Sequence, residues 1–297
     1  MSTPVIPGSV VVGVDGSPGS DIGVVWAATH AQAQRRPLAI VHGAGVPGVT
    51  DLRFDQVEAR KSLRMAGRRV TDAALGLAQR TSPGLTITVH LALQDPRDLL
   101  RTVAAEGSVL VLGARGHGPL ASLLLGSVST ALSTLAPGPV VIARAVLDGD
   151  QEDARMPVVV GVDGSDASTG AVQLAFETAS WEHRPLLAVH ALGELPVHAY
   201  GDLPNDEQTR ALRTRRERLL AESLAGYAEK FPDVTVRTRL VMESPARALR
   251  ETSESAYAVF VGTRGRGPVA GRLLGSVSRS LVEQAHCTVA VVPGGAS

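Results

Sequence analysis

Two copies of one glycine pattern are the residues of this chain best suited to binding chemistry. In the first copy, Gly113-Ala114-Arg115-Gly116 is followed, after nine residues, by Gly126-Ser127-Val128-Ser129. In the second copy, Gly262-Thr263-Arg264-Gly265 is followed, after nine residues, by Gly275-Ser276-Val277-Ser278. Each copy comes after an apolar run that is typical of a buried strand and before a stretch that is typical of a helix. A strand that leads through glycines into a helix start is the local geometry that binds phosphate.

Each residue type in the pattern has a physical reason in such a site. Gly113 and Gly116 would let the backbone turn and approach a ligand without a side chain in the way, and Gly126 would bring the chain round again. Free N–H groups at the helix start would donate to phosphate oxygens, with the two serine hydroxyls as further donors. These donors are Ser127, Val128 and Ser129. Arg115 would lean on the phosphates or face solvent.

A second repeated motif supplies an aspartate. Val10 to Ser17 recurs letter for letter as Val158 to Ser165, so that Asp15 and Asp163 each follow an apolar run. A carboxylate is too negative to sit on a phosphate unaided, and we expect it to accept from a ribose hydroxyl, contact the base or hold a metal ion such as Mg²⁺. Neither half contains a Walker-type motif or a strand-following Gly-x-Gly-x-x-Gly.

The repeats have a period of 148 residues early in the chain and 149 late. A period this long indicates a domain duplication, since solenoid units are about 20–50 residues long. We predict two domains, at residues 1–146 and 155–297, each long enough to bury its own core. The stretch from Arg144 to Pro157 holds four acidic residues and is typical of a solvated linker.

Strand-like and helix-like segments alternate along each half. In the first half the strands are expected at 10–14, 38–42, 85–91, 109–112 and 140–143, and the helices at 21–35, 55–80, from 95, and 127–135. This alternation predicts an α/β fold with a parallel sheet and helices on both faces. If the strand order is 3-2-1-4-5, Asp15 and Gly113 meet at the switch point where such sheets bind ligands. Ile22, Val25, Trp26 and Thr29 are expected to form the apolar face of the first helix.

These motifs resemble the universal stress protein family in its tandem two-domain, ATP-binding form. The resemblance rests on Val-Gly-Val-Asp-Gly-Ser at the start of each half and on the glycine pattern with Leu-Leu-Gly-Ser-Val-Ser, and it covers nearly the whole chain. It implies two Rossmann-like domains (adenine nucleotide alpha hydrolase-like) with sheet order 3-2-1-4-5. It also implies a cytoplasmic role in stress or dormancy physiology, without a defined reaction. In each half it implies a strand-two valine that offers its backbone to adenine: Val41 in the first half and Val189 in the second.

The candidate ATP-binding residues therefore form two matching sets. In the first half they are Gly13, Asp15, Val41, Gly113, Arg115, Gly116, Gly118, Gly126, Ser127, Val128 and Ser129. In the second half they are Gly161, Asp163, Val189, Gly262, Arg264, Gly265, Gly267, Gly275, Ser276, Val277 and Ser278. No catalytic residue is assigned, because no general base, Ser-His-Asp order or paired carboxylates stand out beside the glycines.

Composition excludes some partners. With 29 basic and 29 acidic residues the formal net charge is zero, and aromatic residues make up only 3% of the chain. We therefore expect that the protein does not bind nucleic acid, which normally needs a basic face or aromatic stacking platforms. We also expect no membrane span, because the uncharged stretch 120–143 is broken by Pro137-Gly138-Pro139. The single cysteine, Cys287, is expected to be a small buried residue rather than a reactive thiol. His42 and His190 end the second strand of each half without further ligands near them in sequence, so a structural or site-edge role is favoured over metal binding.

The leading hypothesis is a binding protein with one adenine-nucleotide site per domain, whose occupancy alters shape or partner choice. The alternatives are a slow ATPase or nucleotide phosphohydrolase, and an adaptor with vestigial sites. The apolar edges 140–143 and 289–292 are expected to pair within one chain. The resemblance further suggests a homodimer of tandem chains, and an unidentified protein partner remains open.

Overall fold

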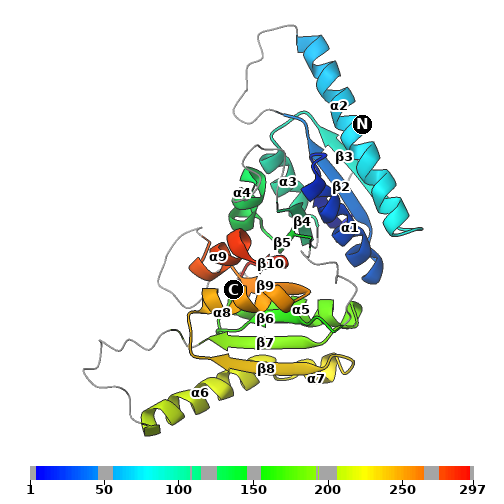
Figure 1. Ribbon diagram of the computed structural model, residues 1–297. Coiled ribbons are helices and arrows are strands. Elements are labelled where there is room, and N and C mark those ends of the chain that lie inside the picture. Colours follow the sequence, from blue (N-terminus) through cyan, green and yellow to red (C-terminus); the bar gives the residue numbers. More distant parts are fainter. Residues whose placement is uncertain are drawn as a thin grey trace. The chain divides into compact units, whose positions relative to one another are not determined.

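The computed structural model describes residues 5–45, 56–107, 109–114, 126–145, 155–191, 193, 206–263 and 274–294. Contacts between residues divide the chain into two compact units, Met1–Ala145 and Val146–Ser297. Each unit has its own parallel strands and its own covering helices (Figure 1).

In the first unit, strands and helices alternate as the sequence predicts. The elements are β1 (Val10–Gly13), α1 (Pro18–Ala33), β2 (Leu38–Gly43), α2 (Gln56–Thr81), β3 (Ile87–Ala92), α3 (Pro96–Ala104), β4 (Val109–Gly113), α4 (Ser127–Leu135) and β5 (Val140–Ala143). All neighbouring strands pair in parallel, in the order β3-β2-β1-β4-β5. The α/β class and the 3-2-1-4-5 order are therefore confirmed.

The second unit repeats this topology. Its elements are β6 (Val158–Gly161), α5 (Asp166–Trp181), β7 (Leu186–Ala191), α6 (Asp206–Leu224), α7 (Tyr227–Lys230), β8 (Val236–Val241), α8 (Pro245–Thr252), the 3₁₀ turn η1 (Ser253–Ser255), β9 (Ala258–Gly262), α9 (Ser276–Gln284) and β10 (Thr288–Val292). Its parallel order is β8-β7-β6-β9-β10. The short helix α7 and the turn η1 were not expected from the sequence.

The central strands are buried on both faces because helices cover both faces of each sheet. Val10, Val11 and Val12 of β1 are completely buried, which is why this strand is a continuous apolar run rather than an alternating one. In the first unit α1 packs against α2, and α3 packs against α4 (Figure 1). Burying each of these valine side chains contributes about 1.5–3 kcal/mol to folding.

The predicted apolar face of the first helix is wrong. Val25 is 40% exposed, Thr29 is exposed, and Trp26 is only half-buried, where it stacks on His30 at 4.4 Å between ring centroids. The buried residues of α1 are mostly small: Ser20, Gly23, Val24, Ala27, Ala28, His30 and Ala31. Small residues occupy the buried face because α1 lies close to the sheet. A Cβ on Gly23, for example, would lie 3.4 Å from the backbone nitrogen of Gly113.

Two further expectations concern membranes and the cysteine. Among the described helices, none has the length and apolar character needed to span a bilayer. Cys287 is 1% exposed, in agreement with the small buried residue predicted from the sequence.

Candidate functional site

The two motifs of each unit meet at the carboxyl edge of its sheet. Strand β1 pairs with β2 on one side and with β4 on the other, so the chain order reverses between β1 and β4. Asp15 follows β1 and Gly113 ends β4. In the second unit Asp163 follows β6 and Gly262 ends β9, and these two strands are also neighbours. Such a reversal point is where open parallel sheets bind ligands.

The aspartate of the first unit is held by the serine two residues later. The backbone N–H and the hydroxyl of Ser17 both donate to Asp15 Oδ1, at 2.9 and 2.6 Å. Ser17 in turn caps α1, since its Oγ accepts from the N–H of Ser20 at 3.2 Å. Gly16 makes the tight turn between them with φ of +79°, a conformation that favours glycine.

The second unit repeats this network at nearly the same distances. Ser165 donates to Asp163 Oδ1 from its backbone N–H at 2.9 Å and from its hydroxyl at 2.6 Å. The cap to Ser168 and the positive φ of Gly164, +76°, are also repeated. In each unit, one carboxylate oxygen is therefore saturated before any ligand binds. Among the described residues, no hydrogen bond is formed by Oδ2 of the exposed Asp15.

The glycines that end the strands are required by packing. A Cβ on Gly113 would lie 2.3 Å from the carbonyl oxygen of Gly19, in the first turn of α1. A Cβ on Gly262 would lie 2.8 Å from the carbonyl carbon of Ala167, in the first turn of α5. These contacts bring the starts of α1 and α5 directly against the strand ends. They therefore place the aspartate turn, residues 15–17 or 163–165, beside the start of the glycine pattern.

Gly13 and Gly161 face side chains instead. A Cβ on Gly13 would lie 2.7 Å from Leu112 Cδ2 and 3.0 Å from Leu100 Cδ1 of α3. A Cβ on Gly161 would lie 2.9 Å from Leu249 Cδ1 of α8. Both glycines thus make room for an apolar side chain of the covering helix.

Helices α4 and α9 begin without a side-chain cap. Their N-cap residues are Gly126 and Gly275, and neither has a side-chain hydrogen bond to the first turn. In contrast, α1, α3, α5 and α8 are capped by Ser17, Asp95, Ser165 and Ser244. Among the described residues, no side chain therefore caps the first N–H groups of α4 and α9, and the helix dipole favours an anion at such a helix start.

The two serines of each helix start have different surroundings. Ser127 and Ser276 are exposed, so their hydroxyls can reach a ligand. Ser129 is buried and donates to the carbonyl of Gly113 at 2.9 Å, whereas Ser278 donates to the carbonyl of Thr263 at 3.1 Å. The latter two serines therefore fasten the helix to the end of the preceding strand.

A backbone bond closes the base of each glycine loop. The N–H of Gly126 donates to Ala114 at 3.3 Å, and that of Gly275 donates to Thr263 at 2.8 Å. Between these anchors the remaining predicted site residues lie outside the described residues: Arg115, Gly116, Gly118, Arg264, Gly265 and Gly267. Val128 and Val277 lie half-buried in the first turns of α4 and α9.

The two strand-two valines lie within the sheet. Val41 pairs with Gly13 in β1 and with His90 in β3, and its carbonyl accepts from the N–H of Val14 at 2.9 Å. Val189 accepts from Val162 at the same distance. Each valine is therefore hydrogen-bonded to the residue that precedes the aspartate, and its carbonyl already has a partner.

The histidines after these valines are part of the same edge. His42 Nδ1 lies 2.6 Å from the carbonyl oxygen of Val14, and His190 Nδ1 lies 2.5 Å from that of Val162. The sequence indicated a structural or site-edge role, and these contacts place both rings directly against the residue that precedes the aspartate. The signal that could have revealed the contact is the joint recurrence of Val-His and Val-Asp-Gly-Ser in both halves.

The next helix starts carry local ion pairs. In the first unit Arg97 donates to the Asp95 carboxylate at 2.8 Å and holds the pKa of Asp95 below its usual range. A Cβ on Gly43 would lie 2.6 Å from Cα of Pro96, so α3 starts directly beside the end of β2. The cation and carboxylate are paired with one another there.

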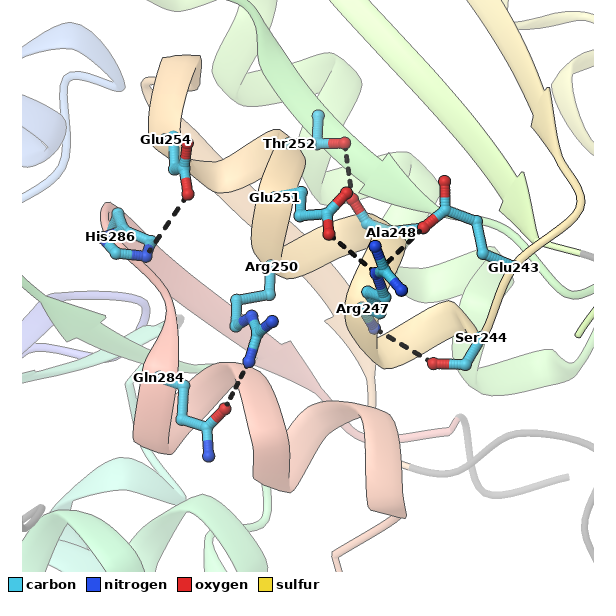
Figure 2. Close-up of polar contacts among 10 residues, drawn as sticks. All are labelled: Glu243, Ser244, Arg247, Ala248, Arg250, Glu251, Thr252, Glu254, Gln284 and His286. Atoms are coloured by element: carbon cyan, nitrogen blue, oxygen red, sulfur yellow. Dashed lines mark hydrogen bonds and ion pairs between the residues drawn. The ribbon is translucent and has the colours of Figure 1, made fainter.

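The second unit has a different arrangement at the equivalent helix. Figure 2 shows Arg247 between two carboxylates, with its Nε 2.8 Å from Glu251 and 3.7 Å from Glu243. The Arg247 hydrogen bond lowers the pKa of Glu251. These pairs are exposed, and exposed pairs contribute little to stability because water and salt screen them.

Metal binding has no preassembled site in the part of the chain that the structure describes. There, no three His, Cys, Asp or Glu side chains are grouped as ligands. A cation at Asp15 or Asp163 would need further oxygen ligands, which the phosphates of a nucleotide can supply.

Comparison with known proteins gives a consistent result. The model of the universal stress protein family matches the chain twice, at residues 8–144 and 155–293. A universal stress protein of Mycolicibacterium smegmatis is 36% identical over 295 residues, covering 95% of this chain and 96% of the relative. One of Mycobacterium tuberculosis is also 36% identical over 295 residues, covering 98% of this chain and 99% of the relative.

Solved structures that cover nearly the whole chain have the same fold. A universal stress protein from Archaeoglobus fulgidus DSM 4304 aligns with a TM-score of 0.70 at 19% identity, covering 98% of this chain and 100% of that chain. Another solved universal stress protein, in complex with cAMP, matches 48% of this chain and 100% of its own, with a TM-score of 0.38 and 26% identity.

Proposed function

The chain belongs to the universal stress protein family, and we propose that each of its two units binds one ATP. The observation that carries the proposal is a doubled arrangement at the carboxyl edge of the sheet. In each unit an aspartate with one saturated oxygen lies at the switch point, and an uncapped helix starts from the glycine loop anchored at the neighbouring strand.

The two parts of the arrangement suit opposite ends of a nucleotide. The open N–H groups and the exposed hydroxyl at Ser127 or Ser276 are donors, so they favour the phosphates. Asp15 and Asp163 are acceptors, so they favour the ribose hydroxyls. A Mg²⁺ ion bound with the nucleotide would reduce the repulsion between the carboxylate and nearby phosphates, because its positive charge offsets the negative charge of both.

We further propose that nucleotide occupancy regulates a cytoplasmic function in stress or dormancy, as the family resemblance implies. The described residues of both sites lie on helix starts and strand ends, so a bound nucleotide would tie α1, β4 and α4 together. In this proposal residues 1–146 and 155–297 form the two nucleotide-binding domains, and two tandem chains associate as a homodimer.

The test is the stoichiometry of ATP binding, measured by calorimetry with Mg²⁺ present. Wild-type protein is expected to bind two ATP per chain. Ser127→Glu should remove one, since a carboxylate at the helix start repels phosphate and occupies its place. Ser276→Glu should remove the other, and the double variant should bind none.

The matched controls are Ser127→Gln and Ser276→Gln, which are similar in size but uncharged and should retain more binding. The Ser127→Glu and Ser276→Glu substitutions should leave the fold intact, because the helix dipole favours glutamate in the first helical turn. Full stoichiometry in the Ser127→Glu, Ser276→Glu protein would refute the placement of the sites. Absence of nucleotide binding by the wild-type protein, and of nucleotide among small molecules released on denaturation, would favour an adaptor with vestigial sites.

A further inference from the structure

One histidine contact occurs in both units with nearly the same geometry. His42 in β2 and His190 in β7 each place Nδ1 against the carbonyl of a residue 28 positions earlier, Val14 or Val162. A carbonyl oxygen can only accept, so Nδ1 carries the proton and donates in both rings. The contact therefore links the end of the second strand to the turn that follows the first strand.

The residue before each aspartate is fixed at both of its backbone groups. The N–H of Val14 donates to the carbonyl of Val41 at 2.9 Å, while its own carbonyl accepts from His42. Val162 has the same two bonds, to Val189 and to His190. The second strand of each unit thus holds this residue from two sides.

Fixing this carbonyl also fixes the aspartate. The C=O of Val14 and the N–H and Cα of Asp15 belong to one rigid peptide plane, so the carbonyl cannot rotate without turning Asp15. Beyond that plane, Ser17 holds Oδ1 of the carboxylate at 2.6 Å. The direction of Asp15 Oδ2 is therefore determined by contacts that exist before any ligand arrives.

Both rings have close neighbours, although His190 is buried and His42 is half-buried. His190 is 3% exposed. His42 packs under α2, where a Cβ on the buried Gly67 would lie 3.1 Å from His42 Cδ2. A ring confined in this way keeps its donor directed at the carbonyl.

We propose that His42 and His190 are positioning residues of the two nucleotide sites. Each donates from Nδ1 to the carbonyl before the aspartate and so holds the aspartate in the orientation that accepts the nucleotide. The inference rests on the proposed function, in which Asp15 and Asp163 contact the nucleotide. Preorganisation of this kind raises affinity because the ligand does not have to order the loop.

Three substitutions at His42 separate the donor from the rest of the ring. Asparagine places its amide nitrogen near the position of Nδ1, so His42→Asn keeps the donor. The amide of His42→Gln reaches toward the position of Nε2, and His42→Leu has no donor. All three are made in the full chain carrying Ser276→Glu, so that only the first site binds ATP.

We expect His42→Leu and His42→Gln to weaken ATP binding about tenfold, the effect of losing one hydrogen bond, while His42→Asn stays within about threefold. The mirror set, His190→Asn, →Gln and →Leu with Ser127→Glu, should behave alike at the second site. Equal affinity in His42→Leu and the parent protein overturns the proposal, as does an equal loss in His42→Asn and His42→Leu. If His42→Leu does not fold, the comparison of Asn with Gln decides.

A second readout needs no nucleotide. Amide hydrogen exchange at Val14 and Ser17 should be faster in His42→Gln or →Leu than in His42→Asn, because both N–H groups belong to the network that the histidine holds. Unchanged exchange overturns the positioning role even if ATP binds. Faster exchange in a protein that binds no ATP would instead refute the proposed function while leaving the contact in place.

Discussion

Gly113 and Gly19 are in such close contact that a Cβ on Gly113 would lie 2.3 Å from the carbonyl oxygen of Gly19. The obstacle is backbone, in the first turn of α1, and it cannot be relieved by rotation of a side chain. This contact joins the strand that leads to the glycine loop with the helix that Ser17 caps, and it therefore links the phosphate side of the proposed site to the aspartate side.

Gly113→Ala is expected to destabilise the first unit. The methyl group would force α1 away from the end of β4, and overpacking of this kind costs about 1–3 kcal/mol. Urea unfolding measures the loss. The control is Gly138→Ala, where the nearest atom, the carbonyl oxygen of Ala104, is 4.0 Å away and the substitution should be nearly neutral. Equal stability of the two variants would contradict the close contact.

Ser17→Ala should weaken both the helix and the aspartate turn. It removes the N-cap bond to Ser20 and the hydroxyl bond to Asp15, and loss of a serine cap costs about 1 kcal/mol. Chemical denaturation should show this loss, and Ser165→Ala should show a similar one in the second unit. Ser62→Ala, at an exposed position within α2, is the control and should have no such cost. Indistinguishable stability of Ser17→Ala and Ser62→Ala would count against the network.

Acid is expected to destabilise the first unit through His30. This residue is 1% exposed, and its burial, together with the charge of Arg36, lowers its pKa from 6.5 to about 3. Below pH 6.5 His30 binds a proton in the unfolded chain but not in the folded chain. The contribution of neutral His30 to stability is therefore complete above pH 6.5 and is lost progressively as the pH falls toward about 3. The slope from this one group is about 1.4 kcal/mol per pH unit.

The measurement is urea unfolding between pH 8 and pH 5 for wild type and His30→Leu. In His30→Leu, the slope of unfolding free energy against pH should fall by the contribution of one proton. The remaining slope includes a contribution from His90, because burial also lowers the pKa of His90. Comparison of slopes, rather than of absolute stabilities, removes the effect of the altered packing on Trp26. An unchanged slope in His30→Leu would show that His30 titrates normally in the folded protein.

Hydrolysis of bound ATP should be far slower than a typical enzyme turnover of ~10 per second. The sequence shows no general base beside the glycines, and in the proposed function the unbonded Oδ2 of Asp15 faces the ribose hydroxyls rather than the phosphates. Steady-state phosphate release tests this, with the Ser127→Glu, Ser276→Glu protein as control. A rate near ~10 per second that disappears in this control would establish an enzyme.

Much of the fold could be predicted because the central strands are continuous apolar runs that are easy to recognise in the sequence. Val10–Gly13 and Val158–Gly161 are buried on both faces, and two-sided burial selects uninterrupted apolar runs. The duplication strengthened each assignment, since the same elements had to be present twice. Face assignment on α1 failed because apolar residues occur on more than one side of this helix: Ile22, Val25 and Trp26 are apolar, yet the buried residues are mainly the small ones beside them.

The sequence by itself determined the duplication, the strand and helix order, and the residue types at the strand ends, because all three are local patterns of the chain. Only the tertiary structure decided how those residues act on one another. It assigned Ser17 to Asp15, Ser129 to the carbonyl of Gly113 and His42 to the carbonyl of Val14. The last two contacts join residues 16 and 28 positions apart: the first requires α4 to start against the end of β4, and the second requires β1 and β2 to bring their carboxyl ends to one edge.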